Sequence, residues 1–113
     1  MRQKMRTITE RARGEIIVRE DMHIQGIVNG NVRVEKGGSL LHQGVINGTV
    51  AVEGGEANIF GFVKGDVINN GGSLNVFGTV NGTVRTESGN TRIAKDAFIK
   101  EIIDLRAPMK ARA

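Results

Sequence analysis

Glycine recurs in this chain with a short and nearly constant period, and that period constrains the fold more than any other feature. Four pairs, each with three residues between its two glycines, follow one another at nearly equal steps: Gly26/Gly30, Gly44/Gly48, Gly61/Gly65 and Gly78/Gly82. A doublet recurs with the same period as Gly37-Gly38, Gly54-Gly55, Gly71-Gly72 and, reduced, Gly89. Self-similarity of this kind indicates one structural unit stacked on itself.

Between the glycines, apolar residues alternate with other residues, which is the pattern of strands with one buried face. Five columns of the aligned repeat are predicted to point inward: Met22, Leu40, Ala57 and Leu74; Ile24, His42, Ile59 and Val76; Val28, Ile46, Val63 and Val80; Val32, Val50, Val67 and Val84; and Val34, Val52, Asn69 and Thr86. Strands of three to five residues, broken at fixed positions, predict coils with three short sides. Each strand then pairs in parallel with its copy one coil away, at about 4.8 Å.

Glycine at the corners of such coils supplies either a positive φ or room for close backbone approach. The Asn-Gly steps at 29–30, 47–48 and 81–82 fit corners, because Asn also tolerates the left-handed region. Left-handed helices of hexapeptide repeats have coils of similar length, but they need a small apolar residue at every sixth position. The inward positions of this repeat are unevenly spaced, as Val28, Val32 and Val34 illustrate, and this argues against a hexapeptide acyltransferase.

Size and composition fit one all-β domain. The chain has 113 residues, only 4% aromatic residues and no Cys, so disulfide and thiolate chemistry are excluded. The first residues are not followed by the apolar stretch of a signal peptide, and no run approaches the roughly 18 apolar residues of a membrane span. We therefore expect a cytoplasmic protein.

The net charge of +4 is unevenly distributed along the chain. Residues 1–21 carry a net charge of +2, residues 22–90 carry −1, and residues 91–113 carry +3. A nearly neutral repeat between basic ends is not the pattern of a nucleic-acid-binding surface. We expect a basic flexible N-terminal tail over 1–14, a β-helix core over 15–105 and a flexible C-terminal tail over 106–113.

No group of residues points to catalysis. The acidic residues inside the repeat fall at outward or corner positions, and no pair of them is arranged for general acid–base chemistry. The glycines do not follow the spacing of a phosphate-binding loop. His23 and His42 lie about one coil apart on opposite faces, and His42 is expected to be a core histidine, unless a bulge turns Leu41 inward instead. We therefore predict no enzyme activity, no metal, no cofactor and no small-molecule substrate.

One edge of the repeat carries apolar residues that are out of phase with the inward columns. Phe60 and Phe77 directly precede a corner glycine, and Ile27, Val45 and Phe62 directly follow one. These side chains are expected to face outward as a patch for a lateral or partner contact. The alternative is that the corner bends enough to tuck the rings inside.

The element Ile24-x-Gly26-x-Val28-x-Gly30-x-Val32-x-Val34, repeated as Val76-x-Gly78-x-Val80-x-Gly82-x-Val84, resembles the bactofilins. These are bacterial cytoskeletal proteins with a right-handed β-helix core between short flexible tails, and the resemblance covers about residues 15–105. Together with the absence of a hexapeptide pattern, it implies a right-handed parallel β-helix, or β-solenoid, with triangular coils of 17–18 residues, which is the spacing of the glycine pairs. His42, Asn69 and Thr86 depart from a uniformly apolar interior.

The resemblance also implies head-to-tail assembly into filaments without nucleotide. Physically, a solenoid has two open ends of unpaired backbone groups, and an end-to-end contact that does not close on itself makes an open filament. The expected interface residues are Ile16, Ile17, Val18 and Met22 at one end and Phe98, Ile99, Ile102, Ile103 and Leu105 at the other. The second group forms either a strand-like coil or a short helix, because its spacing also fits an i, i+4 face. The alternative is that both groups close the ends of a monomer.

The beginning of the chain mixes basic and apolar residues that suit weak attachment to an anionic membrane: Met1, Arg2, Lys4, Met5 and Arg6. A solvated tail is the alternative. The expected function is a scaffold at the inner face of the cytoplasmic membrane that positions cell-shape or cell-wall machinery. Its expected partners are other copies of itself, the inner membrane and envelope proteins, but not nucleic acid. The alternative function is a non-polymerising β-solenoid that binds a protein through Phe60, Phe62 and Phe77.

Overall fold

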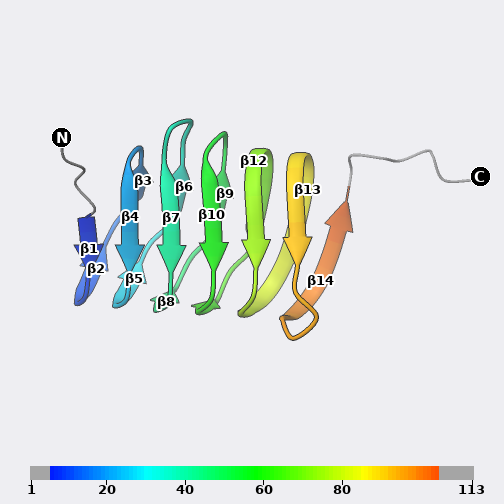
Figure 1. Cartoon of the computed structure of the whole chain (residues 1–113). Helices are drawn as coiled ribbons and strands as arrows, with labels where there is room; N and C mark the ends of the chain where they lie inside the picture. Colours follow the sequence, from blue (N-terminus) through cyan, green and yellow to red (C-terminus); the bar gives the residue numbers. More distant parts are fainter. Residues whose placement is uncertain (1–5, 105–113) are drawn as a thin grey trace, which may run out of the picture.

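The computed structural model describes residues 6–104, and this part of the chain consists of fourteen β-strands without a helix (Figure 1). The strands are stacked into a β-solenoid of about six turns. They are β1 (Arg6–Ile8), β2 (Arg11–Arg13), β3 (Ile16–Val18), β4 (Asp21–Ile24), β5 (Ile27–Asn29), β6 (Val32–Val34), β7 (Ser39–His42), β8 (Val45–Ile46), β9 (Val50–Val52), β10 (Glu56–Ile59), β11 (Phe62–Val63), β12 (Val67–Val76), β13 (Thr79–Ile93) and β14 (Phe98–Asp104). The predicted all-β fold is confirmed.

All strand pairs are parallel, and they form three faces, each with one strand segment from almost every coil. Face I contains β1, β4, β7 and β10 and the last parts of β12 and β13. Face II contains β2, β5, β8 and β11 and the first parts of β13 and β14. Face III contains β3, β6 and β9, the first part of β12, the middle of β13 and the end of β14.

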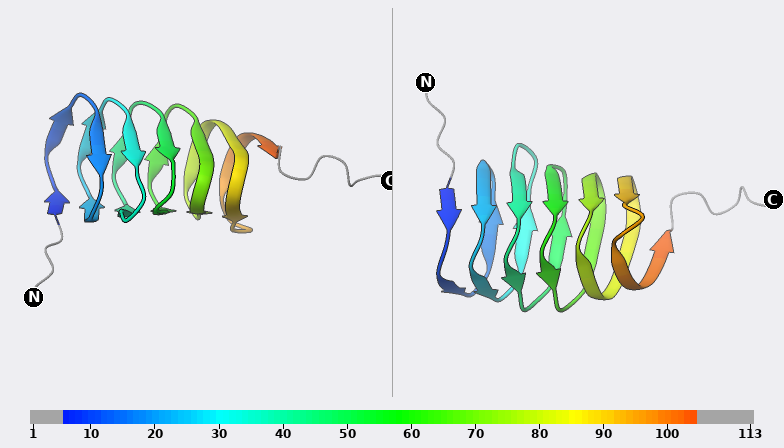
Figure 2. Two further views of the ribbon diagram at one scale, coloured as in Figure 1. Left: turned by 90° about the horizontal axis from the view of Figure 1, so that it is seen from above. Right: turned by 60° about the horizontal axis from the view of Figure 1, so that its bottom comes forward.

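The winding of the chain is right-handed. In Figure 1, the strands of face I run downward in front, and the chain then returns upward behind them while it advances from left to right. Figure 2 shows the same regular stack from two further sides. A right-handed path between parallel strands is the usual one, because the right-handed twist of each strand favours it.

The interior of the solenoid is the one predicted from the alternation. Every member of the five predicted inward columns is buried, with at most 4% of its surface exposed. The columns lie in register along the stack, as the pairs Met22↔Leu40 and Ala57↔Leu74 on face I illustrate. His42 is a core residue, and Leu41 is not turned inward.

The glycines of the pairs allow neighbouring coils to approach each other closely. A Cβ added to Gly61 would overlap the backbone carbonyl of Gly44, and one added to Gly44 would overlap that of Gly26. Positive φ belongs instead to the other glycine mark, with 92° at Gly37 and 115° at Gly71. The glycine pairs therefore require close approach alone, whereas the doublets at 37–38 and 71–72 combine a positive φ with a second glycine whose added Cβ would overlap the preceding coil.

The Asn-Gly steps do not use the left-handed region at Asn, so that part of the interpretation is wrong. No non-glycine residue in the described range 6–104 has a positive φ. Instead, the Nδ2 group of Asn47 donates a hydrogen bond of 2.8 Å to Oδ1 of Asn29 in the preceding coil. At this corner, Asn links neighbouring coils through its side chain.

The solenoid begins earlier than expected, because β1 and β2 lie within the stretch 1–14 that was expected to be a flexible tail. Ile8 and Ala12 of these strands pack against the hydrophobic core. This first coil is shorter than the others, as the pair Ile8↔Ile24 shows, and it carries no glycine pair, so it escapes the pattern of the repeat. At the other end, Phe98–Asp104 is a strand and not a helix.

Candidate functional site: open ends and aromatic patch

The N-terminal end of the stack consists of β1, β2 and β3, each paired on one side only with another described strand. Ile8, Ala12 and Ile16 project inward at this end and are partly buried against the core. Among the expected contact residues, Val18 and Met22 are instead covered by the chain itself. Ile17 points outward beside Arg33 on face III.

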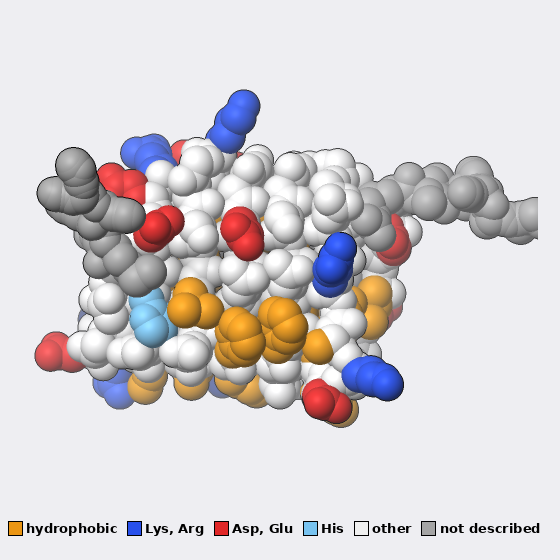
Figure 3. All heavy atoms as spheres, viewed as in Figure 1, with side chains coloured by type: hydrophobic (Ala, Val, Ile, Leu, Met, Phe, Trp, Pro, Cys, Tyr) orange, Lys and Arg blue, Asp and Glu red, His pale blue; other side chains and the backbone are white. Residues whose placement is uncertain are grey.

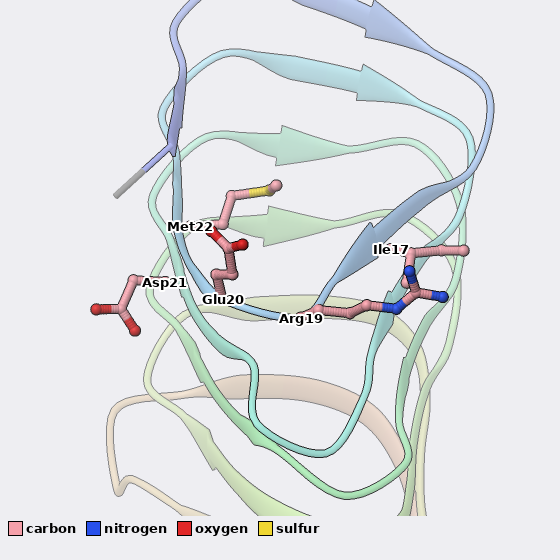
Figure 4. Close-up of a pocket in the computed structure, with 5 residues that line it drawn as sticks. All are labelled: Ile17, Arg19, Glu20, Asp21 and Met22. Atoms are coloured by element: carbon pink, nitrogen blue, oxygen red, sulfur yellow. The ribbon is translucent and has the colours of Figure 1, made fainter. Parts of the chain in front are cut away.

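A hollow of about 180 Å³ lies at a corner close to this end, lined by Ile17, Arg19, Glu20, Asp21 and Met22 (Figure 4). It arises at a short turn, since two residues separate β3 from β4, whereas four separate β6 from β7. In Figure 4, Met22 points toward the interior of the coil, while Asp21 points away from it. Arg19 is paired with Glu35 at 3.0 Å, so the hollow is a charged notch at a short corner.

The C-terminal end is formed by β14 and the last part of β13, and among the described strands β14 pairs with β13 alone. Ile102 lies in register with Val84 in an inward column, yet 55% of it is exposed because no described coil covers it. Ile99 also points inward and packs against the core. The apolar interior therefore continues to this end of the described stack.

Phe98 and Ile103 do not lie over the opening, although they were expected in the same interface. Phe98 is in register with Thr79 on the outer side of face II, where 64% of it is exposed. Ile103 is in register with Arg85 on the outer side of face III. Leu105, Met1, Arg2, Lys4 and Met5 lie outside the described residues, and of Arg6 only the strand placement is described.

One inward column, which contains Val34 and Val52, becomes polar toward the C-terminal end at Asn69 and Thr86, and these polar groups are hydrogen-bonded. Asn69 donates from Nδ2 to the carbonyl of Asn90 at 2.8 Å and to Oγ1 of Thr91 at 3.0 Å, and its Oδ1 accepts the Gly72 N–H at 2.9 Å. The hydroxyls of Thr86 and Thr91 lie 2.7 Å apart. Asn69 and Thr86 are therefore compatible with burial because each has a partner.

His42 differs, because neither of its ring nitrogens has a hydrogen-bond partner. Burial lowers the pKa of His42 to about 4, and the backbone of Gly44 opposes this shift only in part. Among the described residues, no group of His, Asp or Glu is arranged to hold a metal ion. No helix between residues 6 and 104 is long and apolar enough to cross a membrane.

The outward apolar patch is formed as the sequence suggested, and its rings are not tucked inside. Phe60 and Phe77 are 47% and 44% exposed, and they stack with their ring centroids 4.6 Å apart and their planes at 6°. Ile27, Val45 and Phe62 form a register column on the outer side of face II. Figure 3 shows hydrophobic side chains in a band across face I and again along the lower edge, where β5 and β8 lie in Figure 1.

Phe98 extends this patch, because Phe62 and Phe98 are both in register with Thr79. We use the name aromatic patch for Ile27, Val45, Phe60, Phe62, Phe77 and Phe98. Sequence reasoning missed the place of Phe98 here and the places of Ile8 and Ala12 at the N-terminal end. The sequence did contain a signal for this coil, because Ile8 lies nearly one period before Ile24, and Ala12 lies nearly one period before Val28.

No protein-family model, no curated protein and no solved structure matches this chain. The bactofilin resemblance thus depends on the repeated sequence element alone.

Proposed function

We propose that this chain is a structural protein whose solenoids join end to end, without nucleotide, into filaments. The filaments act as a scaffold at the cytoplasmic face of the membrane, where they position cell-shape or cell-wall machinery. The N-terminal residues Met1 to Arg6 supply membrane contact in this proposal. The single observation that carries it is the continuation of the parallel ladders and the apolar interior to both ends of the described stack.

Head-to-tail stacking suits these two ends. A second copy placed on the C-terminal end presents β1, β2 and β3 where the next coil would follow, so each parallel ladder continues at the usual strand spacing of about 4.8 Å. By register, Ile16 of that copy then continues the column of Ile102, and Ala12 continues the column of Ile99. Because the contact uses opposite ends, it does not close on itself, and it produces a filament.

The test compares two neighbouring residues of β14 that point in opposite directions. Ile102→Arg places a charge in the interior column at the opening, whereas Ile103→Arg places it on the outer side of face III. We expect thin filaments from the purified, nucleotide-free protein in negative-stain electron microscopy over a range of salt. Ile102→Arg should abolish them and Ile103→Arg should keep them, with circular dichroism showing that both variants remain folded.

Two results would contradict the proposal. One is a wild-type protein that stays small at every concentration and salt. The other is filaments of normal length from Ile102→Arg, because the C-terminal opening would then not be the interface.

A second candidate function is a non-polymerising module that binds a protein partner. The exposed stack of Phe60 and Phe77 favours it, since apolar surface of this kind often marks a binding site. Small particles in the same microscopy experiment would support this candidate.

A further inference from the structure

The outer side of face II combines apolar residues with cations. Its first outward column contains Arg11, Ile27, Val45, Phe62, Thr79 and Phe98. Its second outward column, two positions later in each coil, contains Arg13, Asn29, Asn47, Lys64, Asn81 and Lys100. Neither column contains a carboxylate. The stacked pair of Phe60 and Phe77 borders this surface at the corner with face I.

The acidic residues that balance cations lie elsewhere on the solenoid. The ion pairs of the described part all involve face III and its corners: Arg19–Glu35 at 3.0 Å, Arg33–Glu15 at 3.2 Å, Arg33–Glu35 at 3.8 Å and Arg85–Glu87 at 3.1 Å. The four cations of face II, which are Arg11, Arg13, Lys64 and Lys100, form no ion pair with any residue of the described range. The two outward columns of face II therefore carry positive charge that no ion pair within the described range engages.

Two of the acids at the corner between faces II and III, Asp66 and Glu101, contact the backbone and the side chain of one threonine. Oδ1 of Asp66 accepts the Thr83 N–H at 2.9 Å, and Oε1 of Glu101 lies 3.4 Å from the Thr83 hydroxyl. These carboxylates are thus engaged with Thr83, and the nearby cations Lys64 and Lys100 remain available to an external anion.

We propose that face II, with the aromatic patch that spans it and its corner with face I, docks the solenoid on an anionic lipid bilayer. The side chains of Phe60, Phe62, Phe77 and Phe98 enter the boundary between headgroups and acyl chains. The four cations lie at the level of the lipid phosphates, which attract basic residues close to the surface. A sheet face about 24 Å long, from six coils at about 4.8 Å spacing, presents these groups side by side to a flat partner.

A second copy of the same face fits this surface less well. Face II against face II would bring two sets of four cations into one interface, and like charges in an interface are repulsive. Single-stranded nucleic acid is also a poorer partner, because its bases stack on free aromatic faces inside a basic groove. Phe60 and Phe77 already cover one face of each other's ring.

This inference goes beyond the proposed function, because it assigns membrane contact to the folded body and not only to the N-terminal residues. It does not require end-to-end assembly. Where copies join into a filament, each copy contributes its own face II, and the filament binds the membrane more tightly through multivalency.

The test measures binding of the full chain to lipid vesicles by flotation, with phosphatidylcholine alone or mixed with phosphatidylglycerol. Lys64→Gln/Lys100→Gln removes two cations from face II, and Lys36→Gln/Arg85→Gln removes two from other surfaces as a matched control. Since each basic residue near the membrane changes affinity about fivefold, the first variant should bind the anionic vesicles about 25-fold more weakly. The control should change binding less than twofold.

A second pair of variants tests the apolar contact. Phe62→Ser/Phe77→Ser removes two rings from the aromatic patch, and Ile68→Ser/Ile103→Ser removes two outward apolar residues from face III. We expect a loss of at least tenfold from the first and little change from the second. Thermal unfolding followed by circular dichroism identifies any variant that has lost its fold.

Repeating the assay with Ile102→Asn separates membrane binding from assembly, since this variant removes the apolar group at the opening. Vesicle binding by a variant without filaments supports the inference even if the scaffold proposal fails. Equal binding by face II variants and their controls would overturn it and leave the N-terminal residues as the membrane contact. Tighter binding to a single-stranded oligonucleotide than to vesicles, or self-association through face II without vesicle binding, would also overturn it.

Discussion

Replacing His42 with Ile should stabilise this protein, although His42 is one of the best-buried side chains. His42 lies between Ile24 and Ile59 in its column, with none of its surface exposed. Neither ring nitrogen forms a hydrogen bond of good geometry, and only the backbone of Gly44 lies close enough to favour the protonated ring. An unsatisfied buried polar group typically costs about 1–3 kcal/mol, and Ile matches its neighbours in the column. We expect His42→Ile to raise the free energy of unfolding by about that amount at neutral pH.

The same residue makes stability depend on pH. Burial lowers the pKa of His42 from 6.5 to about 4 in the folded protein, so the unfolded chain binds the proton first as the pH falls. The free energy of unfolding is therefore not lowered by His42 protonation above about pH 6.5. It decreases as the pH falls from about 6.5 to about 4, and the contribution of His42 becomes constant below that range. The loss amounts to about 1.4 kcal/mol at about pH 5.5 and about 3 kcal/mol at about pH 4.

Guanidinium unfolding curves of the wild type and His42→Ile, recorded from about pH 7.5 to about pH 4, measure both effects. All other residues are the same in both proteins, so the difference between the two curves isolates His42. His23→Gln is the control, because His23 is not fully buried and contacts Gln43 at 2.7 Å. A difference between wild type and His42→Ile that does not change with pH, or a less stable His42→Ile at neutral pH, would refute this reasoning.

Two further predictions concern the corners of the coils. Gly61→Ala should destabilise by about 3 kcal/mol or more, because the new Cβ overlaps the Gly44 carbonyl. Gly71→Ala should cost only about 1–2 kcal/mol, because there the strain lies in φ and the new Cβ makes ordinary contacts of 3.7 Å or longer. Equal thermal unfolding temperatures for the two variants would contradict this. Asn69→Val restores the apolar column but should destabilise by about 1–3 kcal/mol, since it removes the hydrogen bonds from Asn69 to the Gly72 N–H and to the Asn90 carbonyl. A gain in stability in chemical unfolding, as expected for His42→Ile, would show that these hydrogen bonds contribute nothing.

Much of the interior was predictable because the information is local. Alternation in a strand assigns each side chain to one face, so the columns through Val28 and Val32 followed from the residues alone. The spacing of the glycines supplied the length of the coil. The same reasoning could not find the coil that contains Ile8 and Ala12, because its shorter step to the next coil and its lack of a glycine pair break the period.

The candidate surfaces were predictable only in part. A shift of one residue reverses the face to which a strand side chain points, so membership of an apolar cluster does not reveal direction. Phe98 and Ile102 were therefore grouped as one interface, although Phe98 lies on the outer side of face II and Ile102 in the interior column at the opening. Counting charge along the chain likewise placed Arg11 and Arg13 in a tail, whereas they belong to the first coil.

The sequence by itself determined a parallel solenoid with three strands per coil, its interior columns and the positions of its corner glycines. These properties depend on periods within one coil and its nearest copy. Only the tertiary structure decided that Asn69 has partners while His42 has none, that Phe60 stacks on Phe77, and that face II carries cations without carboxylates. Those features depend on which residues of neighbouring coils lie side by side, and that register is set by the packing of the whole stack.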